Sequence, residues 1–522
     1  MWRKSGARAV LLGVGILLAG IMWLRPWSEV QSGAVMNESV IPTEQGQAAP
    51  KDAATYTADM QIDPKAHRVT GTLTVRFVPK DDHVYFHLYP NTFQKAADLS
   101  TDSWERVLGK QREPGGIQIT SVRVNGEDVP VRYQGPTQTL LHVPIASSGM
   151  GTAAHSEIEM RFQLQVPYNK GRLSYNDNAM WLGNWLPILA VKESGGWRLD
   201  PYSAIGDPFY SETANYHLRV QLADEYQLAT SGVESVAVVT QTRPQRQTLY
   251  EIDALNVRDL AMVVMDDTYQ KVTAAVEDTV VHIWSQEGDD PRIVSRLHEA
   301  AEGALRYFSE QFGPYPYKEY DVVKTGGFFG GMEYPGIVFI QEEFFERADP
   351  IGDAVIAHET AHQWFYGLLG NDEVREAWLD ESLSDYATLA YLTDVSRNSA
   401  NLYIKMRQAQ SREAEAYAAK GLAVWQSVEQ FPDWDSYVRL VYARGGAMLW
   451  HLSQEWGQER VHRILRQFVS QHQYGQAKGQ QLVELLSKEA GADATPFIDY
   501  WLHLKLDQQE HAKAWVEQGK HE

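Results

Sequence analysis

The spacing of apolar residues changes once along this chain of 522 residues, and that change limits the folds open to it. Over 56–285 apolar and polar residues alternate, as in "EIEMRFQLQV" from Glu157, and a period of two is typical of half-buried strands. From "IVSRLHEAAEGALRYFSEQF", beginning at Ile293, apolar residues recur at steps of three and four, which predicts helices. Because a chain of this length exceeds one compact core, we predict an α+β multidomain fold, with an antiparallel β-rich N-terminal domain over 56–285 and a mainly helical domain over 286–522.

Two local patterns add detail to this division. Asn125-Gly126 lies between alternating runs in "SVRVNGEDVPVRY", which predicts a hairpin turn in the first domain. The glycine-rich stretch "VKTGGFFGGMEYPGIVFI" from Val323 predicts a strand, a loop and a second strand within the helical domain.

The N-terminal segment, 1–27, contains an apolar run from Ala9 to Leu24 that follows several basic residues. The run is short for a spanning helix and long for the core of a signal peptide. Basic residues before it predict that the remainder of the chain crosses the membrane. We therefore expect a membrane anchor or a cleaved signal segment, of which the pattern favours the anchor, followed by a flexible linker over 28–55. The expected location is the cell membrane, single-pass with the folded part outside the cytoplasm, or the exterior if the segment is cleaved.

Composition removes several functional classes. The chain has no cysteine, which excludes disulfides, cysteine-based zinc sites and thiol nucleophiles. Its formal charge is −21, from 68 acidic and 47 basic residues, and no long basic cluster occurs, so no nucleic-acid partner is expected. The oligomeric state stays open.

The pentapeptide "HETAH" places His358 and His362 four residues apart on a helix that we expect to begin at Asp349-Pro350. Residues at this spacing project from one face of a helix, so both imidazoles can reach one ion. Glu359 lies beside such an ion without binding it, as a general base should. A buried helix whose histidines bond to neighbouring groups can also contain this pattern by chance, so the pentapeptide alone is insufficient.

A zinc site of this kind needs a third protein ligand and one open position. After the 18 residues 363–380 comes Glu381, in "WLDES". Apolar neighbours near helical spacing place Glu381 on a second, buried helix, although a lone glutamate is more often solvated. We predict one Zn²⁺ per chain, held by His358, His362 and Glu381.

These motifs resemble those of the aminopeptidase N-like zinc metallopeptidases, a gluzincin family that includes leukotriene hydrolases. Two further stretches appear in the same order: "GGMEY", from Gly330 to Tyr334, resembles the exopeptidase motif Gly-x-Met-Glu-Asn, and "YARGGAML", from Tyr442, resembles the family's tyrosine followed by a basic residue and glycine. Asp380 and Tyr334 each stand where the family usually has asparagine. The resemblance implies that the helical domain is a thermolysin-like zinc metallopeptidase domain.

What the resemblance implies about function is a zinc-dependent metallopeptidase that removes N-terminal residues from peptides. Glu359 would be the general base, and the hydroxyl of Tyr442 would stabilise the oxyanion. Asp385 would accept a hydrogen bond from the second ring nitrogen of a ligating histidine. The substrate-binding residues would be Glu333, which pairs with the substrate's α-ammonium, together with Gly330, Gly331 and Met332.

Two other functions are left open by the sequence. If Glu333 does not bind an amine, the same design gives a zinc endopeptidase, and Tyr334-Pro335 departs from the family at that point. A third hypothesis is an inactive scaffold that binds peptides or proteins. Relatives also supply a second amine-binding residue from the N-terminal domain, for which Asn184 and Glu212 are weak candidates.

Overall fold

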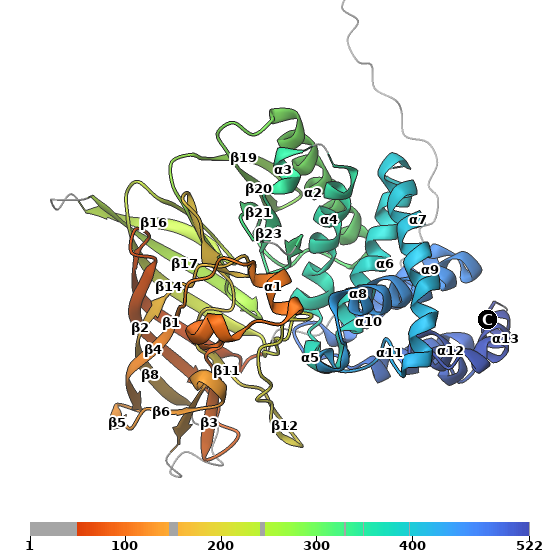
Figure 1. Ribbon diagram of the computed structural model, residues 1–522, viewed down its shortest axis with the longest axis horizontal. Coiled ribbons are helices and arrows are strands. Elements are labelled where there is room, and N and C mark those ends of the chain that lie inside the picture. Colours follow the sequence, from red (N-terminus) through yellow and green to blue (C-terminus); the bar gives the residue numbers. More distant parts are fainter. Residues whose placement is uncertain are drawn as a thin grey trace, which may run out of the picture. The chain divides into compact units, whose positions relative to one another are not determined.

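The computed structural model describes residues 50–145, 155–240, 246–327, 330–347, 349–395 and 397–520. The segments predicted as anchor and as most of the linker lie outside these ranges. Residues Gln45–Glu522 form one compact unit. Within it strands predominate in the first part of the chain and helices in the second (Figure 1).

The largest element of the first part is an eight-stranded sheet with the order β16-β17-β14-β1-β2-β8-β4-β5. Neighbouring strands are antiparallel except for β1 and β14, which are parallel. Figure 1 shows β1 and β14 side by side. The predicted hairpin at Asn125-Gly126 joins β4 to β5, and both residues have positive φ, as this turn requires. The strands are β1 (Ala54–Asp63), β2 (Arg68–Phe77), β4 (Gly116–Val124), β5 (Glu127–Val129), β8 (Ser156–Gln165), β14 (Ala214–Ala223), β16 (Val233–Thr240) and β17 (Gln247–Val257).

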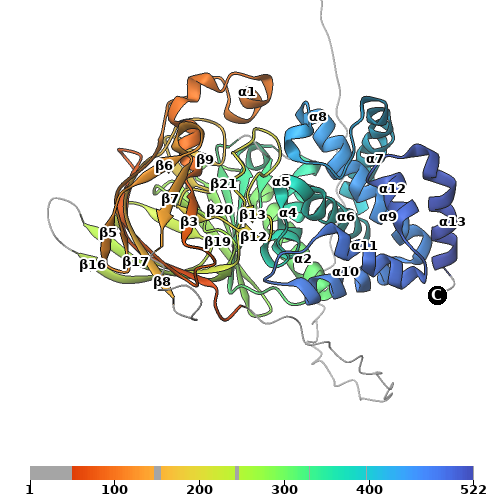
Figure 2. The same cartoon turned by 90° about the horizontal axis from the view of Figure 1, so that it is seen from below.

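Smaller sheets complete the first part. One has the order β15-β18-β10-β9, another β11-β3-β7-β6, and β12 pairs with β13. A short helix, α1 (Asp102–Leu108), is set apart from these sheets in Figure 2. The strands are β3 (His83–His87), β6 (Arg132–Gln134), β7 (Leu140–Pro144), β9 (Leu173–Tyr175), β10 (Ala179–Leu182), β11 (Ile188–Leu189), β12 (Lys192–Glu193), β13 (Gly196–Trp197), β15 (Gln227–Thr230) and β18 (Met262–Met265).

A five-stranded sheet, ordered β19-β20-β21-β23-β22, accompanies the helices. It contains the predicted strand, glycine loop and strand of the "VKTGGFFGGMEYPGIVFI" stretch. Its first two strands come from the range assigned to the first domain, so the sheet crosses the boundary expected at 285/286. Alternation of apolar residues identifies a strand but does not say which sheet the strand joins. The strands are β19 (Tyr269–Val276), β20 (Thr279–Gln286), β21 (Glu319–Thr325), β22 (Gly331–Met332) and β23 (Ile337–Gln341).

Helix α4 carries the first four residues of the "HETAH" pentapeptide, with His362 as its C-cap, and packs against α2, α6 and α7. As the sequence predicts, Asp349 caps α4 by accepting a hydrogen bond from the Ile351 amide, with Pro350 at the first helical position. Two π-helical segments lie nearby. The first, η4 (Gln363–Leu368), directly follows the pentapeptide, and the second, η7 (Val438–Arg444), contains Tyr442. The α-helices are α2 (Pro291–Phe312), α3 (Glu343–Glu346), α4 (Pro350–Ala361), α5 (Glu373–Glu376), α6 (Trp378–Asp394), α7 (Arg397–Ala414), α8 (Trp434–Tyr437), α9 (Gly445–Trp456), α10 (Gln458–His472), α11 (Gly479–Ala490), α12 (Thr495–Trp501) and α13 (Gln509–Gly519).

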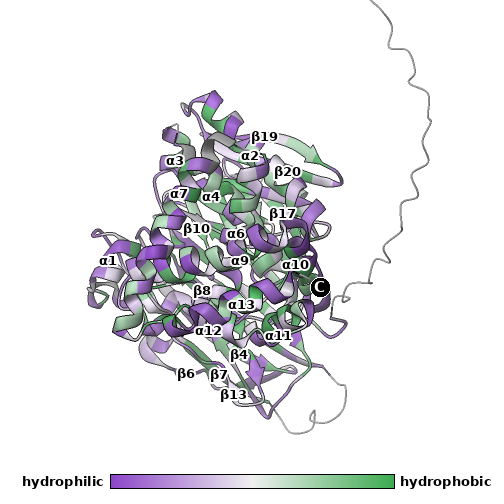
Figure 3. Ribbon diagram, turned by 90° about the vertical axis from the view of Figure 1, so that its right-hand side faces the viewer, coloured by the Kyte–Doolittle hydropathy of each residue, from purple (hydrophilic) through white to green (hydrophobic). Residues whose placement is uncertain are grey.

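The predicted membrane location is contradicted. Among the helices that the structure describes, none combines the length and the apolar character needed to cross a bilayer. The longest, α2, carries Arg296, Glu302 and Arg306 within its span, and each charge at a bilayer centre costs about 2.5–3.5 kcal/mol. Figure 3 shows hydrophilic residues among the hydrophobic ones on α10 and α13 as well. The apolar run from Ala9 to Leu24, on which the expectation depended, lies outside the described residues.

Candidate active site

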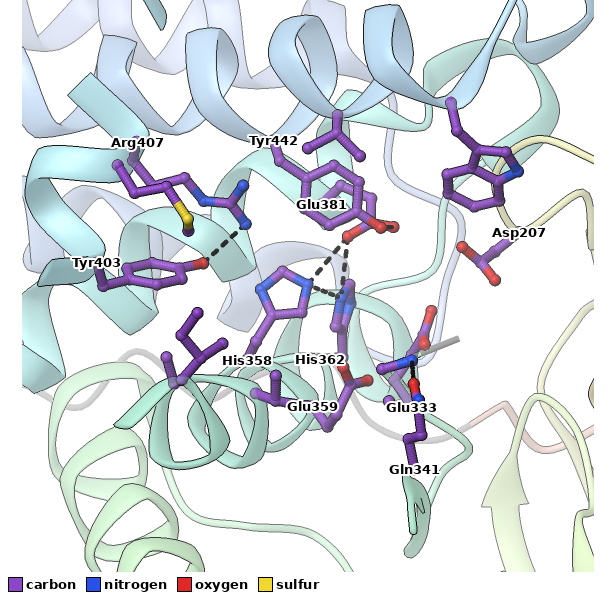
Figure 4. A pocket seen from close by; sticks show the side chains of 18 of the residues that line it. Asp207, Glu333, Gln341, His358, Glu359, His362, Glu381, Tyr403, Arg407 and Tyr442 are labelled. Atoms are coloured by element: carbon purple, nitrogen blue, oxygen red, sulfur yellow. Dashed lines mark hydrogen bonds and ion pairs between the residues drawn. The ribbon is translucent and has the colours of Figure 1, made fainter. Parts of the chain in front are cut away.

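Three buried side chains converge where α4 and α6 pack together (Figure 4). The Nε2 atoms of His358 and His362 are 3.1 Å apart. Oε2 of Glu381 lies 3.1 Å from the first of these nitrogens and 3.3 Å from the second. The three residues predicted as ligands therefore form a triangle of donor atoms.

The triangle has the dimensions of a zinc site. Zinc binds imidazole nitrogen and carboxylate oxygen at about 2.0–2.2 Å in a tetrahedron, which puts neighbouring donor atoms about 3.3 Å apart. The ring of His362 is held in place because its Nδ1 donates a hydrogen bond to the carbonyl of Phe365 (3.0 Å). That tautomer leaves the Nε2 lone pair free for an ion. The residues present thus fit a single zinc ion.

Glu359 is 5 % exposed, and its Oε2 has no hydrogen-bond partner among the described residues. Burial and the nearby carboxylate of Glu333 raise its pKa well above the usual range. Gly331 makes room for it, since a Cβ on Gly331 would lie 2.3 Å from the Glu359 carboxyl group. Gly331, which the resemblance names as a substrate-binding residue, therefore makes room for the candidate base.

We predict that Gly331→Ala lowers kcat by about tenfold or more, because the added methyl must displace the Glu359 carboxylate, and a displacement of about 1 Å in a catalytic group can cost up to a hundredfold. Steady-state kinetics measures the loss. Gly195→Ala is the matched control, since a Cβ there meets nothing within 4 Å. A Gly331→Ala variant with unchanged kcat would contradict this packing.

Glu333 lies at one end of the same site, 4 % exposed, with Oε1 lacking a partner among the described residues. Burial raises its pKa to about 8. Close by, the buried pair of Arg172 and Asp207 comes from the first part of the chain. The sequence reasoning missed both residues; Asp207 belongs to "GDPFY", a stretch with no chemical signature of its own.

Met332 and Tyr334 of the "GGMEY" loop face the first part of the chain. Met332 does not line the site; its sulfur accepts a hydrogen bond from Nε of Arg172 (2.9 Å). The hydroxyl of Tyr334 donates to Oδ1 of Asn184 (2.6 Å), and Nδ2 of Asn184 donates to Asp259 (2.6 Å). Asn184, a weak candidate for amine binding, instead holds this loop.

The second weak candidate lies elsewhere. Glu212 pairs with Lys80, with about half of each side chain exposed, and lines a different cavity.

Tyr442, on η7, donates a hydrogen bond to Oε1 of Glu381, and its ring stacks on His358 with centroids 5.5 Å apart. Asp385 is fully buried. Its carboxylate accepts a hydrogen bond from Tyr403 (2.6 Å) and pairs with Nε of Arg407 (2.8 Å). The structure thus places Tyr442 at the metal site and gives Asp385 partners other than a ligating histidine.

The three predicted ligands, Glu359, Glu333 and Tyr442 border one cavity of about 340 Å³. Such a volume suits a small ligand or the end of a peptide. Both parts of the chain line it, through Arg106, Val107, Arg172 and Asp207 from the first, and through Gly330, Gly331, Glu333, Gln341, Ile351, Ala354, Val355, His358, Glu359, His362, Glu381, Tyr403, Met406, Arg407, Trp434, Val438 and Tyr442 from the second.

Comparison with known proteins points to one family. Residues 297–501 match the Peptidase family M1 domain. The chain is 26% identical to Aminopeptidase N of Streptomyces lividans over 219 residues, which are 40% of this chain and 25% of that protein. It is 25% identical to Aminopeptidase B of Rattus norvegicus over 242 residues, which are 42% of this chain and 36% of that protein. The chain thus matches well under half the length of these relatives.

Solved structures share the fold. The M1 zinc metallopeptidase of Deinococcus radiodurans is 17% identical, with a TM-score of 0.57, over 91% of this chain and 96% of that one. A two-domain M1 zinc metallopeptidase bound to L-arginine gives a TM-score of 0.57 at 16% identity, over 89% and 94% of the two chains. These matches confirm the predicted fold class and the resemblance drawn from the four motifs.

Proposed function

We propose, from the premise that residues 297–501 belong to peptidase family M1, that this chain is a zinc-dependent metallopeptidase that removes N-terminal residues from peptides. His358, His362 and Glu381 would hold one zinc ion. The matched relatives named as aminopeptidases support this activity.

The ion, when bound, supplies Lewis-acid polarisation of the scissile carbonyl and lowers the pKa of water. The remaining work falls to side chains of this chain. Glu359 takes a proton from the attacking water and passes it to the leaving amine, which its unpartnered Oε2 is free to do. The hydroxyl of Tyr442 moves from Glu381 to the carbonyl oxygen, where negative charge develops.

The observation that carries the aminopeptidase assignment is the position of Glu333. Its carboxyl group is buried, borders the same cavity as the ligand triad, and has an oxygen without a partner among the described residues. A substrate's α-ammonium would satisfy this oxygen through a charge-assisted hydrogen bond. Pairing there would place the first peptide bond, and no later one, at the catalytic groups.

Acetylation of the substrate's N-terminus tests this assignment. We expect an acetylated peptide to be cleaved about a hundredfold or more slowly than the same peptide with a free amine, because a lost charge-assisted hydrogen bond is worth about 1.5–3 kcal/mol and the acetyl group also clashes with Glu333. Glu333→Gln should raise KM for the free-amine peptide about tenfold or more. Steady-state kinetics with both peptides measures both effects.

Glu346→Gln is the matched control, since Glu346 is an exposed carboxylate on α3. Equal rates for the free and the acetylated peptide would instead identify an endopeptidase.

A further inference from the structure

The two ends of the cavity differ in charge. Glu333 and Asp207 lie on one side of the histidines, and Arg407 and Tyr403 lie on the other (Figure 4). A peptide held by its amine at the Glu333 end would extend its leaving part past the ligand triad towards Arg407. The charges of the site thus match a substrate that is positive at its start and negative beyond its first peptide bond.

Arg407 is fixed in position by the residues around it. Its Nε pairs with the buried Asp385 (2.8 Å), and its terminal nitrogens donate to the Tyr403 hydroxyl (2.9 Å) and to Oε1 of Gln410 (3.0 Å). The guanidinium carbon also lies 5.5 Å from the centre of the Tyr442 ring. A side chain held at this many points loses little further entropy when it binds a ligand.

The guanidinium still has donors to offer. Each terminal nitrogen carries two N–H groups, and each uses one in the hydrogen bonds above. Arg407 lines the cavity, and its side chain is 11 % exposed. A planar group with two spare N–H groups suits a carboxylate.

The other arginines that line the cavity are placed differently. Arg172 is occupied by Asp207, Met332, Tyr202 and the carbonyl of Gly206, all at the Glu333 end. Arg106 is exposed on α1. Arg407 is therefore the cation suited to the far end of a bound peptide.

We propose that Arg407 binds the C-terminal carboxylate of the substrate, which makes short peptides with a free C-terminus, from dipeptides upward, the preferred substrate class. This inference rests on the proposed aminopeptidase function, because it needs the amine end fixed at Glu333. A C-terminal amide keeps the shape of the substrate but loses the charge that Arg407 recognises.

The test compares each short peptide with its own C-terminal amide, both with free amines. In the zinc-loaded wild type we expect kcat/KM to favour the acid by about 10- to 100-fold, the range of one charge-assisted interaction. In Arg407→Met the preference should fall below about threefold. The ratio is the quantity to measure, since any effect of Arg407 on Tyr442 acts on acid and amide alike.

Three further variants keep the result interpretable. Arg412→Met removes an exposed arginine of the same helix and should leave the ratio unchanged. Asp385→Asn combined with Arg407→Met removes both members of the buried pair, which avoids leaving an unpaired charge if the single variant does not fold. Arg407→Lys keeps the charge and should retain part of the preference.

Binding separates this inference from the proposed function. In a Glu359→Gln background, calorimetric titration with the dipeptide and its amide reports the same preference without turnover. Failure of the amine assignment would appear as equal rates for the free and the acetylated peptide and as an unchanged KM in Glu333→Gln, and neither result depends on the C-terminus of the substrate. The inference is overturned if the wild type treats acid and amide alike at every length, or if Arg407→Met keeps the preference, or if Arg106→Met is the variant that abolishes it.

Discussion

Glu359→Gln is expected to lower kcat about a thousandfold or more while zinc content stays at that of the wild type. Glutamine has nearly the same shape as glutamate but cannot accept the proton of the attacking water, and general acid–base catalysis contributes about 10²- to 10⁴-fold. Glu359 is not a member of the ligand triangle, so the ion should remain bound. Steady-state kinetics and elemental analysis of the same sample measure the two quantities.

Two further observations sharpen the test of Glu359. The thermal stability of the variant should not fall, because Oε2 of Glu359 has no hydrogen-bond partner among the described residues to lose. Glu299→Gln, which removes an exposed carboxylate on α2, is the control and should keep full activity. If Glu359→Gln kept a tenth or more of the wild-type kcat, another group would have to be the base.

Glu381→Ala is expected to remove both the zinc ion and the activity, with kcat/KM falling by about 10⁴-fold or more, because water at a site without zinc keeps its ordinary pKa of about 15.7. Two imidazoles alone do not complete the three-ligand set of a catalytic zinc site. Metal content by elemental analysis and kcat/KM on a short peptide measure the outcome.

Thermal unfolding gives a second readout for Glu381→Ala. In the wild type, zinc at about a thousand times its Kd should stabilise the fold by about 4 kcal/mol, so a chelator should lower Tm. The variant's Tm should not respond to the chelator. Thr393→Ala, on the same helix and bonded to the Leu389 carbonyl, should behave as the wild type. Stoichiometric zinc in Glu381→Ala would refute the ligand set.

The parts of the structure that the sequence predicts are those governed by local rules. The capped start of α4 follows from Asp349-Pro350, and the hairpin follows from Asn125-Gly126, because each needs only neighbouring residues. The triangle of donor atoms follows from helical spacing plus one later carboxylate. Alternation of apolar residues could not assign β19 and β20 to the five-stranded sheet, because tertiary packing decides which strands pair.

The parts that the sequence does not predict depend on contacts between distant segments. Asp385 has the offset of a histidine partner, which stays a prediction, and the structure adds contacts of its Oδ1 with Tyr403 and Arg407 of α7. Met332 belongs to a motif that resembles a substrate site, yet Arg172 draws it into the packing against the first part of the chain. Tyr403, Arg407 and Arg172 belong to no recognisable motif, so the sequence pattern does not predict these contacts.

The link from Tyr334 through Asn184 to Asp259 determines what this chain would lose if it were shortened. A Cβ on Gly183 would lie 2.0 Å from the Tyr334 hydroxyl, so the β-rich part is shaped around the residue that follows Glu333. Expressing 286–522 by itself would therefore deprive the loop that carries Glu333 of its support, and would also remove Asp207 and Arg172. Under the proposed function, selectivity for chain ends, rather than peptide-bond cleavage as such, is what the N-terminal part of this polypeptide would provide.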